Sequence, residues 1–205
     1  KFWNKKNSLI SFILLPLTIF IQILISVQKR MTIIKKISIP VICVGNIYLG
    51  GTGKTPLSIE IATVLKKFNK KTAIIKKSYV EHSDEFGLIE SRGVALFKNL
   101  SRIKAISSAI ENNFNCVVLD DGLQDFSINK NISIVCFNEK QLWGNGMTFP
   151  SGPLREPLSS LKRCQIVVIN GSKNFEFERK IQNISKDISI YYSKYLPINF
   201  EDFRN

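Results

Sequence analysis

The chain has 205 residues, of which 44% are apolar and 22% are charged, and this composition excludes a disordered protein. Lys and Arg number 29 against 16 Asp and Glu, so the formal net charge is +13. Such an excess indicates an anionic partner such as phosphate, acidic lipid or nucleic acid, or else only a solvated basic surface.

The first long segment, residues 8–27, contains twenty amino acids without a charge, and lysines precede it while Lys29 and Arg30 follow it. A helix of that length measures about 30 Å, which is the thickness of the hydrocarbon core of a bilayer. We therefore expect residues 1–30 to form a membrane-associated helix. A helix buried against the rest of the protein is the alternative, and the sequence leaves it open.

A glycine-rich loop follows the first strand-like run. Residues 38–44 are apolar and β-branched, and residues 56–67 have a helical pattern. Between them lies Gly50-Gly51-Thr52-Gly53-Lys54-Thr55, in the strand–loop–helix context of a phosphate-binding loop. Backbone N–H groups would surround phosphate oxygens, Lys54 would reach the β- and γ-phosphates, and the Thr55 hydroxyl would face Mg²⁺. A strict Walker pattern has glycine where this chain has Tyr48, so the loop is a variant.

Acidic residues recur further along the chain. After a strand expected at 72–75, Ser83, Asp84 and Glu85 could be only a solvated loop or a helix cap. After a helix expected at 102–111 and a buried strand at 116–119, the pair Asp120 and Asp121 stands at a strand's carboxyl end. This Walker-B-like placement predicts a metal site, with Gln124 hydrogen-bonding nearby.

The third cluster combines glycines, prolines and one Arg-Glu pair. It follows a strand expected at 132–137, covers residues 144–157 and includes Arg155 and Glu156; another strand is expected at 166–169. So rigid a loop suits the binding of a charged ligand, although a plain connector remains the alternative. Apolar strands alternating with helices predict an α/β fold of the P-loop NTPase type, with a mostly parallel sheet flanked by helices.

Two other features bear on function. The four cysteines each lie in or beside an apolar run without a close pair, so we expect them in the core of a reduced, cytosolic domain: Cys43, Cys116, Cys136 and Cys164. His82 is the only histidine, which is typical of a surface residue. Because no nucleic-acid-binding motif is present, we expect no nucleic acid partner.

Three motifs in this order resemble the lipid A 4'-kinase (tetraacyldisaccharide 4'-kinase) family. They are VGNIYLGGTGKTP at residues 44–56, DDGLQ at residues 120–124, and GNG followed by PSGPLREPLSSLKR at residues 150–163, behind an apolar segment with LLPL. The resemblance covers nearly the whole chain to about residue 171. It implies a membrane-associated helix at 1–30, a P-loop kinase domain at 31–171, and the start of an incomplete C-terminal domain at 172–205.

The resemblance implies transfer of the ATP γ-phosphate to the 4'-hydroxyl of an acylated glucosamine disaccharide 1-phosphate, forming lipid IVA. The reaction would occur at the cytoplasmic face of the bacterial inner membrane, with ATP and Mg²⁺ as cofactors and the disaccharide lipid and the bilayer as partners. Asp84 is then the candidate base, in a catalytic set with Lys54 and Asp121. The metal ligands would be Thr55, Asp120 and Asp121. The nucleotide contacts would be Tyr48, Leu49, Gly50, Gly51, Thr52, Gly53, Lys54, Thr55, Arg102, Gln124, Arg155 and Glu156.

The chain also departs from the family pattern. Asp125 stands where the family usually has His, and residues 77–80 replace an Arg-Gly-Tyr-Gly segment. Most of the smaller C-terminal domain, with a His that the family pairs with the motif Asp, is not matched. A nucleotide-binding remnant without kinase activity is therefore one alternative function. A membrane-associated partitioning-type ATPase is another, although such proteins usually carry Lys at the position of Leu49.

Overall fold

The computed structural model describes residues 2–5, 8–78 and 83–194. Its centre is one seven-stranded sheet with the order β3-β2-β4-β1-β5-β6-β7, in which every adjacent pair of these strands runs parallel. The strands are β1 (Val41–Gly45), β2 (Thr72–Lys77), β3 (Ala95–Asn99), β4 (Cys116–Asp120), β5 (Ile132–Asn138), β6 (Ile166–Asn170) and β7 (Ser189–Ser193). The predicted parallel α/β sheet is confirmed.

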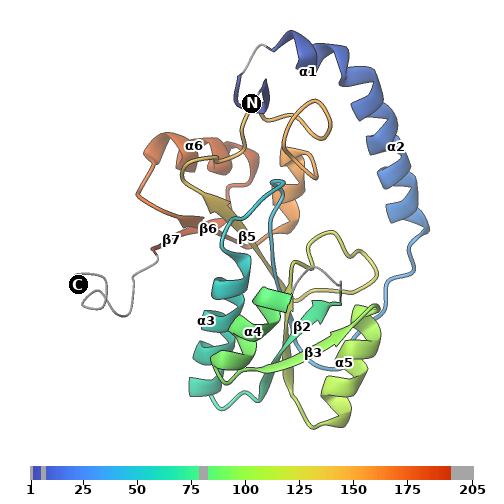
Figure 1. The fold of residues 1–205 in the computed structure, drawn as a ribbon, viewed down its shortest axis with the longest axis vertical. Coiled ribbons are helices and arrows are strands. Elements are labelled where there is room, and N and C mark those ends of the chain that lie inside the picture. The colour runs from blue at the N-terminus through green and yellow to red at the C-terminus, as the bar shows by residue number, and fades with distance from the viewer. Residues whose placement is uncertain (1, 6–7, 79–82, 195–205) are drawn as a thin grey trace.

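Helices cover both faces of the sheet (Figure 1). On one face, α3 (Lys54–Lys67) and α4 (Ser83–Ser91) pack Ile59 and Ile89 against the buried Val118 of β4. On the other face lie α5 (Arg102–Glu111), the 3₁₀ helix η2 (Leu158–Arg163) and α6 (Phe175–Ile184), whose Phe177 belongs to the second apolar core. Because water reaches neither face of the central strands, these strands consist of continuous apolar runs.

The predicted elements agree with the structure except at their ends. The first strand begins at Val41 rather than at residue 38, because Pro40 has no N–H for the sheet ladder. The first helix of the sheet layer begins at Lys54, and Pro56 lies in its first turn, where proline is tolerated. The elements α4, β3, α6 and β7 were not predicted. All four cysteines are buried and free, as expected for core residues, and burial raises the pKa of Cys43 and Cys136 to about 12.

The boundary expected between residues 171 and 172 does not divide the sheet. Residues 175–184 form α6, whose N-cap Asn174 accepts a hydrogen bond from Phe177 N at 3.0 Å. β7 then pairs with β6, with Val168 opposite Tyr191. Through residue 194 the chain therefore adds a helix and an edge strand to the same layer.

The N-terminal segment is broken into η1 (Phe2–Asn4), α1 (Leu9–Ile13) and α2 (Leu15–Met31). In Figure 1, α2 runs along the outside of the molecule, apart from the helices that cover the sheet. Among the described residues, no helix is both long and apolar enough to cross a lipid bilayer. Nor is the segment buried against the protein, because Ser11 and Thr18 are the buried residues of these two helices.

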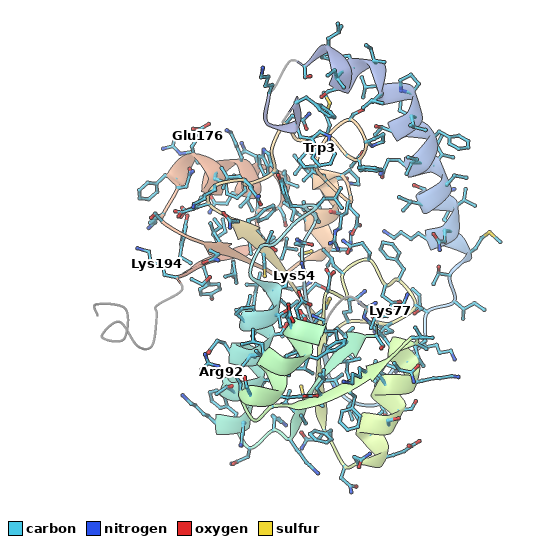
Figure 2. All side chains as sticks on the ribbon, viewed as in Figure 1. Trp3, Lys54, Lys77, Arg92, Glu176 and Lys194 are labelled. Atoms are coloured by element: carbon cyan, nitrogen blue, oxygen red, sulfur yellow. The ribbon has the colours of Figure 1, made fainter. Side chains whose placement is uncertain are left out.

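The face of α1 and α2 that contacts the protein is polar. Thr18 Oγ1 lies 2.7 Å from Ser151 Oγ, and Asn145 Nδ2 donates to Ser11 Oγ at 3.2 Å. Near the start of the chain Trp3 Nε1 donates to Pro150 O at 3.0 Å, so the segment is tied to the 144–157 loop at several points (Figure 2). Large apolar side chains are exposed along both helices: Leu9, Ile10, Phe12, Ile13, Leu17, Ile19, Phe20, Ile23, Leu24, Val27 and Met31.

Candidate active site

The phosphate loop leaves the carboxyl end of β1, near the middle of the sheet, and leads directly into α3. Gly50 has a φ of 146° and Gly53 a φ of 86°, conformations that favour glycine. Asn46 Nδ2 donates to Gly50 O at 3.0 Å and to Thr52 Oγ1 at 3.1 Å, which fixes the curvature of the loop. The N-terminus of α3 thus lies behind a glycine turn, an arrangement that binds anions through backbone N–H groups.

Tyr48 and Leu49 connect this loop to the 144–157 loop. Tyr48 is only 6% exposed and belongs to the apolar core, while Leu49 N donates to Pro153 O at 2.8 Å. Arg155 N donates in turn to Ile47 O at 2.7 Å. The residue that replaces the Walker glycine is therefore a packing residue, and the two loops are joined through their backbones.

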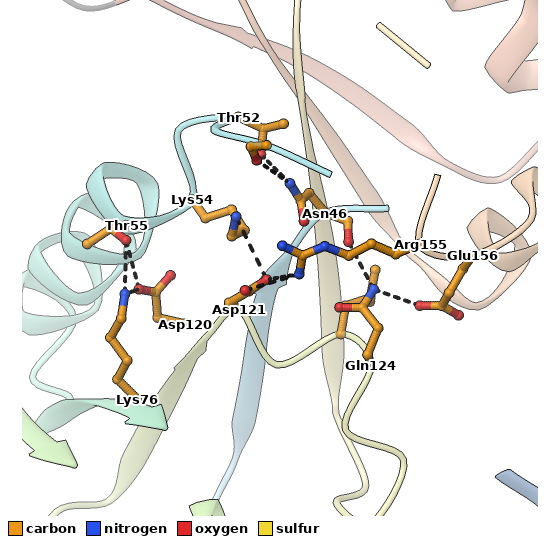
Figure 3. Close-up of polar contacts among 12 residues, drawn as sticks. Asn46, Thr52, Lys54, Thr55, Lys76, Asp120, Asp121, Gln124, Arg155 and Glu156 are labelled. Atoms are coloured by element: carbon orange, nitrogen blue, oxygen red, sulfur yellow. Dashed lines mark hydrogen bonds and ion pairs between the residues drawn. The ribbon is translucent and has the colours of Figure 1, made fainter. Parts of the chain in front are cut away.

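Asp120 ends β4 and is completely buried. Its carboxylate accepts hydrogen bonds from Thr55 Oγ1 at 2.8 Å, from Ser58 Oγ at 3.1 Å and from Lys76 Nζ at 2.5 Å (Figure 3). Lys76 also forms an ion pair with Glu85 of α4. Burial opposes the charged form of Lys76, but the two carboxylates outweigh it and raise the pKa of this lysine above its usual value. Neither Lys76 nor Ser58 was predicted.

Asp121 lies just beyond the strand with a φ of 54°, in the left-handed region. Arg155 Nη1 lies 3.1 Å from each of its carboxylate oxygens, Lys54 Nζ lies 3.8 Å from Oδ1, and Arg102 Nη2 donates to its backbone oxygen at 2.7 Å. Burial opposes ionisation of this carboxyl, yet Lys54 and Arg155 outweigh it and hold its pKa below the usual value. Asp121 is therefore an anion surrounded by three cationic side chains.

Gln124 and Glu156 hold two loops together. Gln124 Nε2 donates to Glu156 Oε1 at 2.8 Å and to Asn46 O at 2.9 Å, and Arg163 Nη2 donates to the same Glu156 oxygen at 2.7 Å. Although Arg155 and Glu156 are neighbours in sequence, only the arginine contacts Asp121. The glutamate instead joins the 144–157 loop to the DDGLQ segment (Figure 3).

Two cavities meet at this cluster of charges. A small one of about 220 Å³ lies beside the phosphate loop and is lined by Gly50, Gly51, Lys54, Lys76, Lys77, Glu85 and Asp120. A larger one of about 560 Å³ lies toward α2 and includes Gln28, Lys77, Gln124 and Asp125. Lys77, Arg102, Asp121 and Arg155 line both cavities. The cluster thus forms the boundary between a pocket at the phosphate loop and a cleft under α2.

Comparison with known proteins identifies the family. The family model described as tetraacyldisaccharide-1-P 4'-kinase matches residues 10–95 and 88–202. The chain belongs to this family. It is 42% identical to the tetraacyldisaccharide 4'-kinase of Pelagibacter ubique, over 99% of this chain and 65% of the relative. It is 29% identical to a probable mitochondrial tetraacyldisaccharide 4'-kinase of Arabidopsis thaliana, over 83% of this chain and 52% of the relative. The chain thus spans between half and two thirds of these relatives' length.

Solved structures share the fold of this kinase family member. A crystal structure of LpxK from Aquifex aeolicus in complex with ATP superposes with a TM-score of 0.68 at 21% identity, covering 95% of this chain and 85% of that one. The hydrogenase maturation factor HypB from Archaeoglobus fulgidus gives 0.53 at 13% identity, with 76% and 81% coverage. At such identities the similarity establishes the fold alone, and it confirms the predicted P-loop type.

Asp125, which departs from the usual family residue, orients an arginine. Its Oδ2 lies 3.3 Å from Arg102 Nη1, while its Oδ1 accepts from Ser127 N at 3.2 Å and from Ser127 Oγ at 2.5 Å. Burial opposes ionisation, but the Ser127 hydrogen bonds and Arg102 outweigh it and lower the pKa of Asp125. An acid at this position therefore holds the Arg102 guanidinium beside Asp121.

The structure separates the two acids at the start of α4. Asp84 is exposed in the first turn of the helix, whereas its neighbour Glu85 lines the small cavity and pairs with Lys76. His82 and residues 79–80 of the altered family segment lie outside the described residues. Glu85 is therefore an acid of the small cavity that the sequence did not predict, and it is adjacent in sequence to the predicted base Asp84.

The expected Mg²⁺ fits one part of the site. Among the described residues, no group of three or more His, Cys, Asp or Glu side chains could form a metal cage. Mg²⁺ at nucleotide sites, however, uses one or two protein oxygens together with phosphates and water. Thr55 Oγ1 and Asp120 Oδ2 are such oxygens, 2.8 Å apart, and the Lys76 ammonium already lies against both as a positive charge. Asp121, by contrast, is bound to Arg155.

Proposed function

We propose that this chain is an ATP-dependent kinase that transfers the γ-phosphate to the 4'-hydroxyl of tetraacyldisaccharide 1-phosphate, forming lipid IVA in lipid A biosynthesis. The observation that carries the proposal is the wall of Arg102, Asp121 and Arg155 shared by the phosphate-loop cavity and the cleft under α2. A phosphoryl group moving from one side to the other would pass the guanidinium groups of Arg102 and Arg155. Membership of the family supports the same reaction.

The nucleotide side rests on the phosphate loop and Lys54. Backbone N–H groups at the start of α3 would bind phosphate oxygens, and Lys54 would move from Asp121 to the phosphates. Arg155 stays within 3.1 Å of Asp121, so that acid keeps a cationic partner after Lys54 leaves. Thr55 and Asp120 would hold Mg²⁺, which supplies neutralisation of phosphate charge when bound.

The acceptor side combines a charged cleft with an apolar groove. The cleft presents Lys77, Arg102 and Arg155, which suit the phosphate of a disaccharide 1-phosphate. A further groove of about 570 Å³ runs between α2 and the 144–157 loop and is lined by Leu15, Ile19, Ile23 and Met147 among others. A smaller cavity shares lining residues with the charged cleft and with the apolar groove. The three cavities therefore follow one another along α2. Acyl chains would lie along the groove while the sugars enter the cleft.

The orientation of α1 and α2 supports a bilayer partner. Their buried residues are the hydroxyl-bearing Ser11 and Thr18, while most of their large apolar side chains are exposed, the reverse of a helix that packs on a soluble domain. Such a face is stable at a membrane interface, with Lys29, Arg30, Lys35 and Lys36 available to anionic head groups. We place this surface on the cytoplasmic face of the bacterial inner membrane, where ATP is present.

The proton of the attacking hydroxyl is assigned to Asp84. Asp120 accepts three hydrogen bonds and Asp121 has a lowered pKa beside Arg155, so both are poor bases. In the transfer, the sugar oxygen forms a bond to the γ-phosphorus and its proton goes to the Asp84 carboxylate. The bond from the γ-phosphorus to the bridging oxygen breaks, and ADP leaves. Asp84 is exposed in the first turn of α4, the turn that also carries Glu85 of the small cavity.

A phosphate-transfer assay tests the proposal. The 205-residue chain is incubated with ATP labelled in the γ-phosphate and tetraacyldisaccharide 1-phosphate in mixed micelles. We expect the label in the lipid with the wild type and none with Lys54→Ala. ATP binding without any release of label would instead indicate a nucleotide-binding remnant. Label in inorganic phosphate alone would indicate an ATPase of the partitioning type.

A further inference from the structure

Lys76 is a buried cation that the phosphate-transfer scheme does not use. It lies on β2 and is 5% exposed. Its ammonium nitrogen lies 2.5 Å from Asp120 Oδ2 and 3.3 Å from Thr55 Oγ1, and it also pairs with Glu85 (Figure 3). Lysine is rarely buried unless it is paired, and here three oxygens from three different elements surround it.

The ammonium lies against the same two oxygens that would hold a divalent cation. Mg²⁺ binds oxygen ligands at about 2.0–2.1 Å, so a metal on Thr55 and Asp120 would come within a few ångströms of the Lys76 nitrogen. Two positive charges at that distance repel each other strongly in a site with little water. Metal and ammonium therefore cannot both occupy the space between Asp120 Oδ2 and Thr55 Oγ1.

We propose that Lys76 is a built-in counter-ion that competes with the divalent cation for Asp120 and Thr55, and that Glu85 retains the ammonium when the metal enters. The inference rests on the proposed function only in taking the cation to be the metal that accompanies the nucleotide. Without metal, Lys76 keeps the buried Asp120 carboxylate compensated, and an unpaired charge there would destabilise the fold. Because the ammonium competes with the metal, we expect metal binding to be weak in the absence of nucleotide.

Glu85 is suited to this role by its position. It belongs to the first turn of α4, a different element from the one that carries Asp120, and its side chain is 45% exposed. Lysine carries its charge on a flexible four-carbon chain, so the ammonium can move toward Glu85 without a change in β2. The ion pair with Glu85 already exists, and only the contacts with Asp120 and Thr55 would be given up.

The sheet offers a matched control. Lys98 of β3 is the register partner of Lys76, but it is largely exposed and pairs with Glu90 at 3.9 Å. Lys98→Met removes one positive charge from the same row of the sheet without touching Asp120. Any change in metal affinity caused only by the net charge of the protein should therefore occur in this variant too.

The test measures Mn²⁺ binding to the full chain by electron paramagnetic resonance, with neither nucleotide nor lipid present. Lys76→Met should tighten Mn²⁺ binding by about tenfold or more, because the competing charge is gone. Lys98→Met should stay within about twofold of the wild type. If Lys76→Met does not fold, Lys76→Gln keeps a hydrogen-bond donor to Asp120 and should give the same tightening. A folded Lys76 variant with unchanged Mn²⁺ affinity would overturn the proposal.

Two further variants test the partners. Asp120→Asn in the Lys76→Met background should abolish the tightened binding, and persistence of that binding would overturn the site. Glu85→Gln should weaken Mn²⁺ binding several-fold in the wild type but change it less than about twofold in Lys76→Met, since the carboxylate acts through the ammonium. Equal weakening in both backgrounds would contradict the role of Glu85. Because these titrations need neither ATP nor lipid, their outcome is independent of the phosphate-transfer assay.

Discussion

Substituting Lys54 by Ala should weaken ATP binding by about 10- to 150-fold. The Lys54 side chain is 14% exposed at the start of α3, so its contact with a phosphate would be largely shielded from water. A hydrogen bond to a charged group contributes about 1.5–3 kcal/mol. Since about 1.4 kcal/mol changes a dissociation constant tenfold, that range gives the expected loss.

The contacts of Lys54 in the free protein reduce this figure only slightly. Lys54 Nζ lies 3.8 Å from Asp121 Oδ1, a separation at which the ion pair is weak. Arg155 contacts the same carboxylate at 3.1 Å, so Asp121 remains paired when Lys54 turns to the nucleotide or is removed. We therefore expect the loss to appear in nucleotide affinity and hardly in the stability of the fold.

The measurement is a calorimetric titration with a non-hydrolysable ATP analogue at about 0.15 M salt, where the screening length is about 8 Å. The control is Lys66→Ala, an exposed lysine in the last turn of the same helix, about 18 Å away. This control should bind within about twofold of the wild type. A Lys54→Ala dissociation constant within about threefold of the wild type would refute the reasoning. Equal weakening in both variants would also refute it, because it would show that ATP affinity depends only on the net charge of the protein.

Three further outcomes are expected. Asp84→Asn should lower turnover by about 10² to 10⁴ while ATP affinity is nearly unchanged, and near wild-type turnover would show that Asp84 is only a loop acid. Replacing the exposed Phe20 and Leu24 of α2 together by Glu should release the chain from anionic vesicles in a flotation assay, and continued binding at high salt would place the membrane contact elsewhere. Gly152→Ala would put a Cβ 2.3 Å from Met147 O, so it should destabilise by about 1–3 kcal/mol and lower the Tm by several degrees. The control Gly87→Ala meets nothing within 4 Å and should not lower the Tm; equal melting of both variants would contradict the clash.

The central part of the fold could be predicted because its signals are local. Gly50 and Gly53 adopt backbone angles that favour glycine, and the helix that follows has its own periodicity. The strands that were predicted lie inside the sheet, where both faces are buried and the sequence is continuously apolar. The two missed strands, β3 and β7, are the two edges of the sheet. Their residues are only partly buried, so they show no continuous apolar run.

Lys76 shows what local patterns cannot supply. The predicted strand ended at Ile75, before two lysines, yet β2 continues to Lys77 and buries the first of them. The burial depends on Asp120, which is 44 positions away, and on Glu85 of a helix that was not predicted.

Similarly, the uncharged segment 8–27 suggested one continuous helix. The chain divides it at Leu14, close to Pro16, and turns its hydroxyl groups toward the 144–157 loop.

The most direct test of the proposed reaction is the position of the new phosphate on the lipid. The 205-residue chain, ATP, Mg²⁺ and tetraacyldisaccharide 1-phosphate are incubated, and the lipid product is examined by mass spectrometry and phosphorus NMR. The account predicts one added phosphate monoester, at the 4'-oxygen, formed in an amount equal to the ADP released. A lipid that gains no phosphate while ATP binds, or that gains it at another hydroxyl, would contradict the account.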